Sequence, residues 1–472
     1  MSRTLLATTP TFDARAWAVL AVLCGTAFLE GLDISMMGVA LPAIREELGL
    51  STSSLQWVVS AYVLGYGGFV LLGGRAADLF GRRRMFLLWL GIFVAFSGLG
   101  GLASEGWMLL TARFVTGVAA GFLTPASISI ITTNFAPGDA RHRAVLVFSG
   151  AGAAGFSLGM VAGGLLTAIG WRWVFFAPVI FASVLLVAAL RTLPDDGRPA
   201  AREGGVDLPG ALTVTGSMLL LVLGVVRAPD VELAVTAVTL LASAALAAAF
   251  VAIERRATAP LVRLGILRSA PLVRANLGAL LFFASFVGFQ FIVVLYLQEL
   301  RGWSALETGL ALMLAGLDAV IAPTITPVLV RRYGNLRVLL GGVLAGVVAY
   351  ALFLPLGADW TYALMVPTML LIAVAFACAY GPFTIAATDG IDEDEQGLAS
   401  GLLNVSIQFG AALGLAVVTA VNVAATDGSS PQALLDGYRA ALIVPVVSAA
   451  LASLVVATGL RPMALRWSAA GG

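Results

Sequence analysis

Long runs of apolar residues recur along this chain, and short polar segments separate them. A helix needs about 20 mainly apolar residues to cross a bilayer, and fourteen runs come close to that length. The pattern therefore predicts an all-α integral membrane protein with fourteen membrane spans. The predicted spans are 17–41, 55–73, 85–103, 107–131, 145–168, 173–190, 208–226, 232–253, 275–298, 307–330, 336–356, 361–386, 397–422 and 440–459.

A weak internal repeat divides these spans into two sets. The segment FGRRRMFLL at 80–88 resembles YGNLRVLL at 333–340. Pro125 and Pro382 are separated along the sequence by a similar number of residues. This repeat aligns the first six spans with the last six and leaves two spans over. Parallel repeats of this kind are typical of transporters whose binding site lies near the bilayer midplane. We therefore expect two six-helix bundles, 1–194 and 259–472, with a linker and an inserted helix pair at 195–258.

Composition and charge support a membrane protein and suggest its orientation. The chain is 60% hydrophobic and 11% charged, whereas a soluble domain is about 25% charged. All 27 basic residues are arginine, and most fall on one side of the predicted spans. The positive-inside rule then places both termini in the cytoplasm. Richness in Arg, Ala and Gly indicates a bacterial source, and therefore the bacterial plasma (inner) membrane. The net charge of +1 gives no sign of a nucleic-acid partner.

Cysteine and histidine usage argues against a metal or catalytic centre. Cys24 and Cys378 both lie within apolar runs, which argues against a disulfide framework or a cysteine metal site. His142 is the single histidine, so any Ser/His/Asp catalytic set would have to use it. We therefore predict no metal, no cofactor and no enzymatic activity.

Four ionisable residues fall inside predicted spans: Glu30 and Asp33, Arg113, and Asp318. Each such residue costs about 2.5–3.5 kcal/mol on insertion scales, so it is a functional candidate. The spacing of Glu30 and Asp33 puts them on one helix face. Asp33 and Arg113 lie within roughly 3 Å of the same depth at 1.5 Å rise per residue, so they can pair. Glu30 and Asp318 lie near the midplane.

These charges predict proton coupling and substrate binding. A carboxyl group in a closed cavity holds a proton, and it releases the proton when water or a cation arrives. We assign coupling to Asp33 and Arg113, with protons and a small-molecule substrate as the partners. The alternative is a structural ion pair with acids that merely line a wet cavity. The candidate substrate-binding residues are Glu30, Asp318, Tyr62, Gln290, Asn404 and Gln408, and Tyr66 is a further cavity-lining candidate.

The polar segment GGRAADLFGRRR at 73–84 joins the second and third spans. It resembles the signature loop of the major facilitator superfamily, with pattern G-x-x-x-D-x-x-G-[RK]-[RK]. The matching residues are Gly74, Asp78, Gly81, Arg82 and Arg83. The resemblance implies a transporter that alternates between two shapes, with this loop as an inner latch. The arginines also fit membrane topology alone.

Several stretches of the first bundle resemble the 14-helix drug:proton antiporter family of that superfamily. They are LDIS at 32–35, VALP at 39–42, LQWV at 55–58, RFVTG at 113–117 and WRW at 171–173. Thr116 stands where that family has Gln. In the last bundle, Asn404 and Gln408 match its G-x-x-N-x-x-x-Q pattern. The resemblance covers nearly the whole chain.

The fifth span carries the glycines of the family's antiporter motif, which are Gly155, Gly159, Gly163 and Gly164, but Met160 replaces the expected Pro. Small residues four apart allow close helix packing, and the family places this contact against the opposite bundle. A generic packing seam is the alternative interpretation.

The resemblance as a whole implies a monomer in the lipid bilayer that exports a hydrophobic, cationic small molecule in exchange for protons. A metabolite importer or uniporter on the same fold is the alternative. A sensor or scaffold without flux is a further one, although the carboxyl groups within the membrane argue against it.

Overall fold

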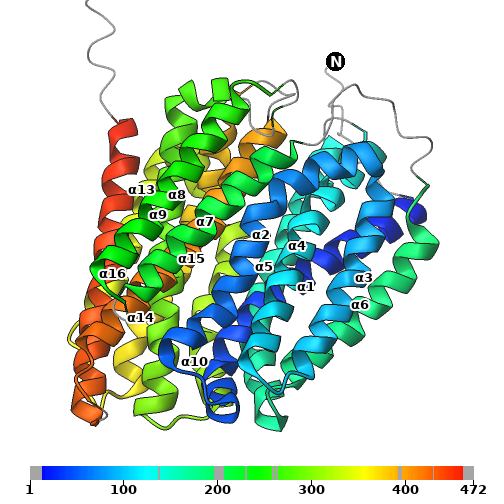
Figure 1. Cartoon of the computed structure of the whole chain (residues 1–472). Coiled ribbons are helices and arrows are strands. Elements are labelled where there is room, and N and C mark those ends of the chain that lie inside the picture. The colour runs from blue at the N-terminus through cyan, green and yellow to red at the C-terminus, as the bar shows by residue number, and fades with distance from the viewer. Residues whose placement is uncertain are drawn as a thin grey trace, which may run out of the picture.

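The computed structural model describes residues 13–136, 139–195, 207–228, 231–257, 260, 264–391, 396–428 and 430–460. Every regular element in these ranges is a helix, and most helices run from one end of the molecule to the other (Figure 1). Thirteen of these helical segments are long and apolar enough to cross a membrane. The predicted span 55–73 lies in α2 (Thr52–Phe80), whose 29 residues extend roughly 43 Å at 1.5 Å per residue.

The helices follow the predicted order of bundle, inserted pair and bundle. The first bundle holds α1 (Ala14–Leu48), α2, α3 (Arg82–Gly101), α4 (Gly106–Asn134), α5 (Asp139–Ile169) and α6 (Trp173–Thr192). The inserted pair is α7 (Leu208–Arg227) and α8 (Leu233–Glu254). The second bundle holds η1 (Leu264–Arg268), α9 (Ala270–Leu295), η2 (Tyr296–Leu300), α10 (Ala305–Leu312), η3 (Ala315–Leu317), α11 (Asp318–Thr324), α12 (Thr326–Tyr333), α13 (Asn335–Phe353), α14 (Tyr362–Thr388), α15 (Gln396–Ala425), α16 (Pro431–Ala457) and η4 (Thr458–Leu460).

Helix packing repeats between the two bundles. α1 packs on α5 and α3 packs on α4 and α6, just as α9 packs on α15 and α13 packs on α14 and α16. Gly81 and Gly334 each end one helix and begin the next, with φ of 98° and 83°. Only glycine adopts such angles readily. The fold therefore has the predicted two bundles and inserted pair. The boundaries near 194 and 259 stay a prediction, and 196–206 and 258–259 lie outside the described residues.

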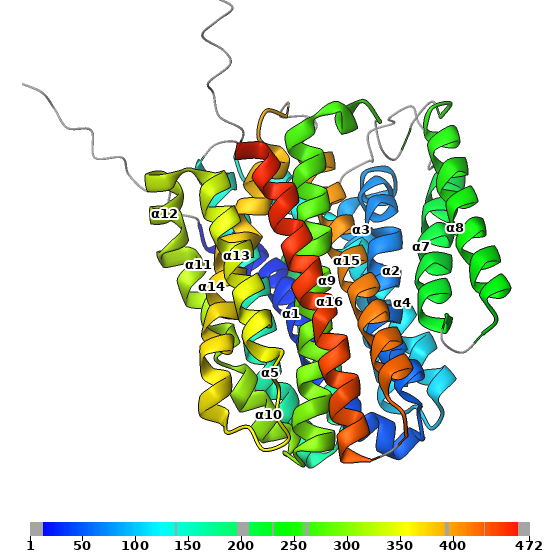
Figure 2. The same cartoon turned by 90° about the vertical axis from the view of Figure 1, so that its left-hand side faces the viewer.

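The inserted pair covers one flank of the junction between the bundles (Figure 2). α7 packs against both α2 and α15, and the Thr215 hydroxyl donates a hydrogen bond to the Gly68 carbonyl at 2.9 Å. Ser217 and Ser243 join α7 to α8 by reciprocal hydroxyl-to-carbonyl bonds of 2.9 and 2.8 Å. α7 thus contacts both bundles at once, while most of α8 faces outward.

The tenth predicted span, 307–330, is broken into short helices. It consists of α10, η3, α11 and α12, and Asp318 begins α11 directly after η3. Pro323 lies within α11 and Pro327 at the start of α12, and proline removes a backbone donor and clashes with the preceding turn. Irregular backbone at membrane depth is tolerated where it lines a cavity or is buried in protein.

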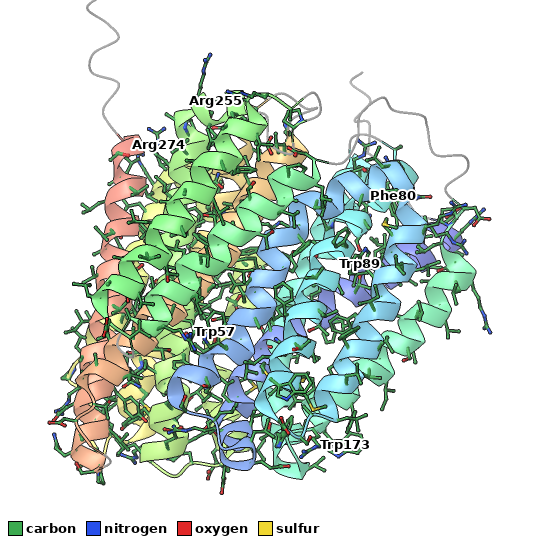
Figure 3. All side chains as sticks on the ribbon, in the orientation of Figure 1. Trp57, Phe80, Trp89, Trp173, Arg255 and Arg274 are labelled. Atoms are coloured by element: carbon green, nitrogen blue, oxygen red, sulfur yellow. The ribbon has the colours of Figure 1, made fainter. Side chains whose placement is uncertain are left out.

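Phe80, Arg255 and Arg274 lie at one end of the molecule, called the Phe80 face, and Trp173 lies toward the opposite end (Figure 3). That opposite end, where α1 finishes at Leu48, is the Arg45 face.

Candidate functional site

A cavity of about 290 Å³ lies between the two bundles. Helices α1, α2, α4, α5, α9, α11, α14 and α15 contribute to its wall. Aromatic and aliphatic side chains dominate the described lining, and its only ionisable acids are Glu30 and Asp318. The aromatic lining residues are Tyr66, Phe148, Phe156, Phe283, Phe286, Phe291, Phe376 and Tyr380. No arginine is among the described lining residues, so the wall is apolar with two points of negative charge when the acids ionise.

The predicted Asp33–Arg113 pair is present, in a fully enclosed position. Arg113 Nη1 lies 2.6 Å from Asp33 Oδ2, and each side chain is 1% exposed. Arg113 Nε also donates to the Val58 carbonyl at 3.0 Å. The guanidinium lies 4.5 Å from the centre of the Tyr62 ring. Neither charged residue is part of the cavity wall. Removal of one partner from a buried pair of this kind leaves an uncompensated charge in the protein interior.

Of the two tyrosine candidates on α2, Tyr66 lines the cavity and Tyr62 does not. The Tyr62 ring is fully buried and lies against Arg113, and it is not part of the cavity wall. Tyr66, four residues later on α2, lines the cavity instead. One helical turn separates the two positions, and a sequence pattern does not specify which turn faces the cavity.

The Glu30 carboxyl group is held at the cavity wall by the Thr124 hydroxyl. The Thr124 hydroxyl lies 2.9 and 2.7 Å from the two Glu30 carboxyl oxygens. The Tyr66 hydroxyl donates to Thr124 Oγ1 at 3.0 Å. Glu30, Thr124 and Tyr66 all line the cavity. Sequence reasoning identified Glu30 but missed Thr124, because a threonine in an apolar span carries no charge to mark it.

Two predicted cavity residues of the second bundle contact α5 of the first. Ser157 Oγ donates to Asp318 Oδ1 at 3.4 Å, and Gln290 Nε2 donates to Met160 Sδ at 3.5 Å. Met160, which replaces the family's Pro, therefore takes part in a contact between the bundles. Asn404 and Gln408 on α15 also line the cavity, and their role in binding stays a prediction.

The α5 glycines correct the expected packing partner. A Cβ on Gly155 would lie 2.1 Å from the Phe28 carbonyl, and one on Gly159 would lie 2.8 Å from the Leu32 carbonyl. A Cβ on Gly163 would lie 2.8 Å from the Met36 Cα atom. These three glycines therefore face α1 of their own bundle, not the opposite bundle. Gly164 alone among the four faces the opposite bundle, where its Cβ would lie 2.8 Å from the Ala305 carbonyl of α10.

The loop at 73–84 is largely helical. Gly74 and Asp78 fall within α2, and Gly81 makes the turn into α3; the Asp78 side chain is outside the described part of the structure. Arg83, next to Arg82 at the start of α3, pairs with Asp195 at 2.5 Å. That contact joins α3 to the segment directly after α6, and the latch role of the five loop residues stays a prediction.

A polar cluster joins the bundles at the Arg45 face. Arg45 Nη1 lies 2.6 Å from Glu299 Oε1, and the Tyr438 hydroxyl donates to Glu299 Oε2 at 3.3 Å. Gln298 Nε2 donates to the Val39 carbonyl at 3.0 Å. Gln298 and Glu299 lie in η2, a π-helical turn, and such turns are frequent at functional sites. Sequence reasoning missed this cluster, because nothing in the sequence pairs residues 254 positions apart.

Comparison with known proteins identifies the class. The chain matches the Major Facilitator Superfamily over residues 23–415. With two helical bundles around a central cavity, it belongs to this superfamily. It is therefore a multi-pass membrane transporter of small molecules and not an enzyme.

Curated relatives narrow the comparison to antibiotic resistance and export proteins. A lincomycin resistance protein from Streptomyces lincolnensis is 34% identical over 456 residues, covering 95% of this chain and 93% of the relative. A puromycin resistance protein from Streptomyces alboniger is 33% identical, covering 90% and 86%. A cephamycin export protein from Amycolatopsis lactamdurans is 33% identical, covering 91% and 89%.

Solved structures agree on the fold. The POT family transporter PepTSo superposes with a TM-score of 0.69 at 15% sequence identity, covering 96% of this chain and all of that one. At this identity the likeness bears on the fold alone.

Proposed function

We propose that this chain exports a hydrophobic, cationic small molecule from the bacterial cytoplasm in exchange for protons. The observation that carries the proposal is an aromatic cavity between the bundles whose described ionisable lining groups are both acids, Glu30 and Asp318. The relatives' names, resistance and export proteins, support the outward direction.

The cavity wall suits a hydrophobic cation in two ways. Carboxylates attract positive charge, and aromatic faces attract cations through the ring quadrupole, by about 0.5–2 kcal/mol per contact. Phe376 lies near the middle of the aromatic wall, 4.9 Å from Phe286 and 5.6 Å from both Phe283 and Tyr380 between ring centres. An anionic substrate would meet the two acids without a described arginine to offset them.

Proton coupling is assigned to Asp33 with Arg113. Protonation of Asp33 would remove the charge that Arg113 pairs with inside the protein, so the pair has two states of very different energy. Because α1 carries both Asp33 and Glu30, a shift in this pair bears directly on the cavity. Each proton that moves inward across 100 mV supplies about 2.3 kcal/mol, enough to bias the cycle toward export.

Alternating access would move the bundles around the cavity. The contacts of Arg45, Gln298 and Glu299 support a state that is closed at the Arg45 face. The arginine bias supports an orientation with that face outside and both termini inside, and the 73–84 loop would then be the inner latch. Access would then pass from one face to the other by rocking of the bundles.

Everted membrane vesicles with an acidic interior test the proposal, with tetraphenylphosphonium and a panel of hydrophobic cations as probes. Addition of a transported cation should release protons from vesicles that contain the protein, and control vesicles without it should not respond. Flux that continues unchanged after the pH gradient is collapsed would favour the importer or uniporter instead.

A further inference from the structure

The two acids of α1 sit in groups of the same construction. In each group α1 supplies the acid, α4 supplies the residue that bonds it, and α2 supplies a tyrosine. The groups are Asp33 with Arg113 and Tyr62, and Glu30 with Thr124 and Tyr66. The acids are three residues apart and the tyrosines four, about one helical turn in each case, whereas Arg113 and Thr124 lie eleven residues apart on α4.

The two groups differ in charge and in access. Arg113 neutralises Asp33 in a place closed to the cavity. Thr124 bonds Glu30 through a neutral hydroxyl, at the cavity wall. The negative charge of ionised Glu30 is therefore stabilised by hydrogen bonding but not cancelled by its α4 partner. It remains available to a cation that enters the cavity.

The Thr124 hydroxyl can form a hydrogen bond with Glu30 whether Glu30 is ionised or protonated. A threonine hydroxyl has one proton to donate and can accept two hydrogen bonds. Tyr66 donates to Thr124 Oγ1, so the Thr124 proton is free to point at the carboxylate. When Glu30 is protonated and donates instead, the Thr124 proton can turn to the Ala120 carbonyl at 3.2 Å. One hydroxyl thus satisfies both charge states of Glu30.

We propose that Thr124, oriented by Tyr66, is a positioning residue that fixes the Glu30 carboxylate for a cationic substrate. The proposal rests on the proposed function, in which Glu30 contacts the cation. It adds Thr124 on α4 and Tyr66 on α2, which would set the strength of that contact without changing the charge of Glu30.

Binding of tetraphenylphosphonium to the purified full chain tests the proposal, with variants Thr124→Val, Thr124→Ser, Tyr66→Phe and Glu30→Gln. A hydrogen bond to a charged group contributes about 1.5–3 kcal/mol, so Thr124→Val should weaken binding about tenfold or more. Thr124→Ser should restore it, and Tyr66→Phe should weaken it less than Thr124→Val. Thr26→Val is the matched control, because the buried Thr26 hydroxyl bonds the Leu23 carbonyl of its own helix.

The infrared carbonyl band of protonated Glu30, assigned as the band that Glu30→Gln removes, gives a readout that needs no ligand. Protonated Glu30 donates its O–H to Thr124 Oγ1, so loss of this bond in Thr124→Val should shift the band, and Thr26→Val should leave it in place. An unmoved band together with unchanged binding in Thr124→Val would overturn the positioning role. If wild type and Glu30→Gln bind the cation equally, or neither binds it, the proposed substrate contact itself is wrong.

Discussion

Arg113 reaches from α4 to Asp33 on α1 with 2.6 Å between Nη1 and Oδ2, and each side chain is 1% exposed. Two opposite charges are therefore held within the membrane-spanning core and away from the cavity wall. Such a pair is a poor means of adding stability, because desolvation offsets most of the attraction. In the proposed function its role is coupling, because protonation of Asp33 would remove the charge that Arg113 pairs with.

Removal of one partner should cost much more than removal of both charges. Arg113→Ala leaves Asp33 buried and unpaired, which costs about 3–5 kcal/mol, so thermal unfolding of the purified protein should begin well below the wild-type temperature. The double variant Asp33→Asn with Arg113→Gln should recover most of the loss. Arg255→Ala, at the exposed Phe80 face, is the control. Equal loss in the single and double variants would contradict the account of the pair.

The glycines of α5 should be required for packing inside the first bundle. Gly155→Ala would place a Cβ 2.1 Å from the Phe28 carbonyl of α1, a distance that forces the helices apart. We expect overpacking to lower stability by about 1–3 kcal/mol, measured by thermal unfolding. Gly150→Ala on the same helix meets nothing within 4 Å and should behave like wild type. Two variants of equal stability would refute the assigned α1–α5 contact.

The ion pair at the Arg45 face should favour closure of that face. Arg45→Glu puts two acids together and should shift the balance between conformations, since a partly exposed pair contributes up to about 1 kcal/mol, roughly a fivefold change in equilibrium. Export by this variant should change severalfold. The exchange Arg45→Glu with Glu299→Arg should bring the rate back toward wild type. An exchanged pair that is no better than the single variant would rule out direct pairing as the cause.

The sequence predicts the fold well, because apolar run length and arginine placement report directly on membrane crossing. It also locates the Asp33–Arg113 pair, because depth along a helix follows from counting residues. Other features depend on which turn of a helix faces which neighbour, and this is not encoded in motif letters. The sequence offers both Tyr62 and Tyr66 as cavity-lining candidates, and only the structure separates them. It likewise places Gly155, Gly159 and Gly163 against α1, and only Gly164 against the opposite bundle. The break before Asp318 and the contact of Glu299 with Arg45 arise from tertiary packing.

Proton release by everted vesicles tests the central claim, which is coupling through Asp33. Addition of a transported cation should release protons with the wild-type protein, and Asp33→Asn should abolish both this release and uphill export. Asp436→Asn, at a largely exposed acid, should retain both. Undiminished uphill export by Asp33→Asn, at matched protein levels, would contradict the coupling role.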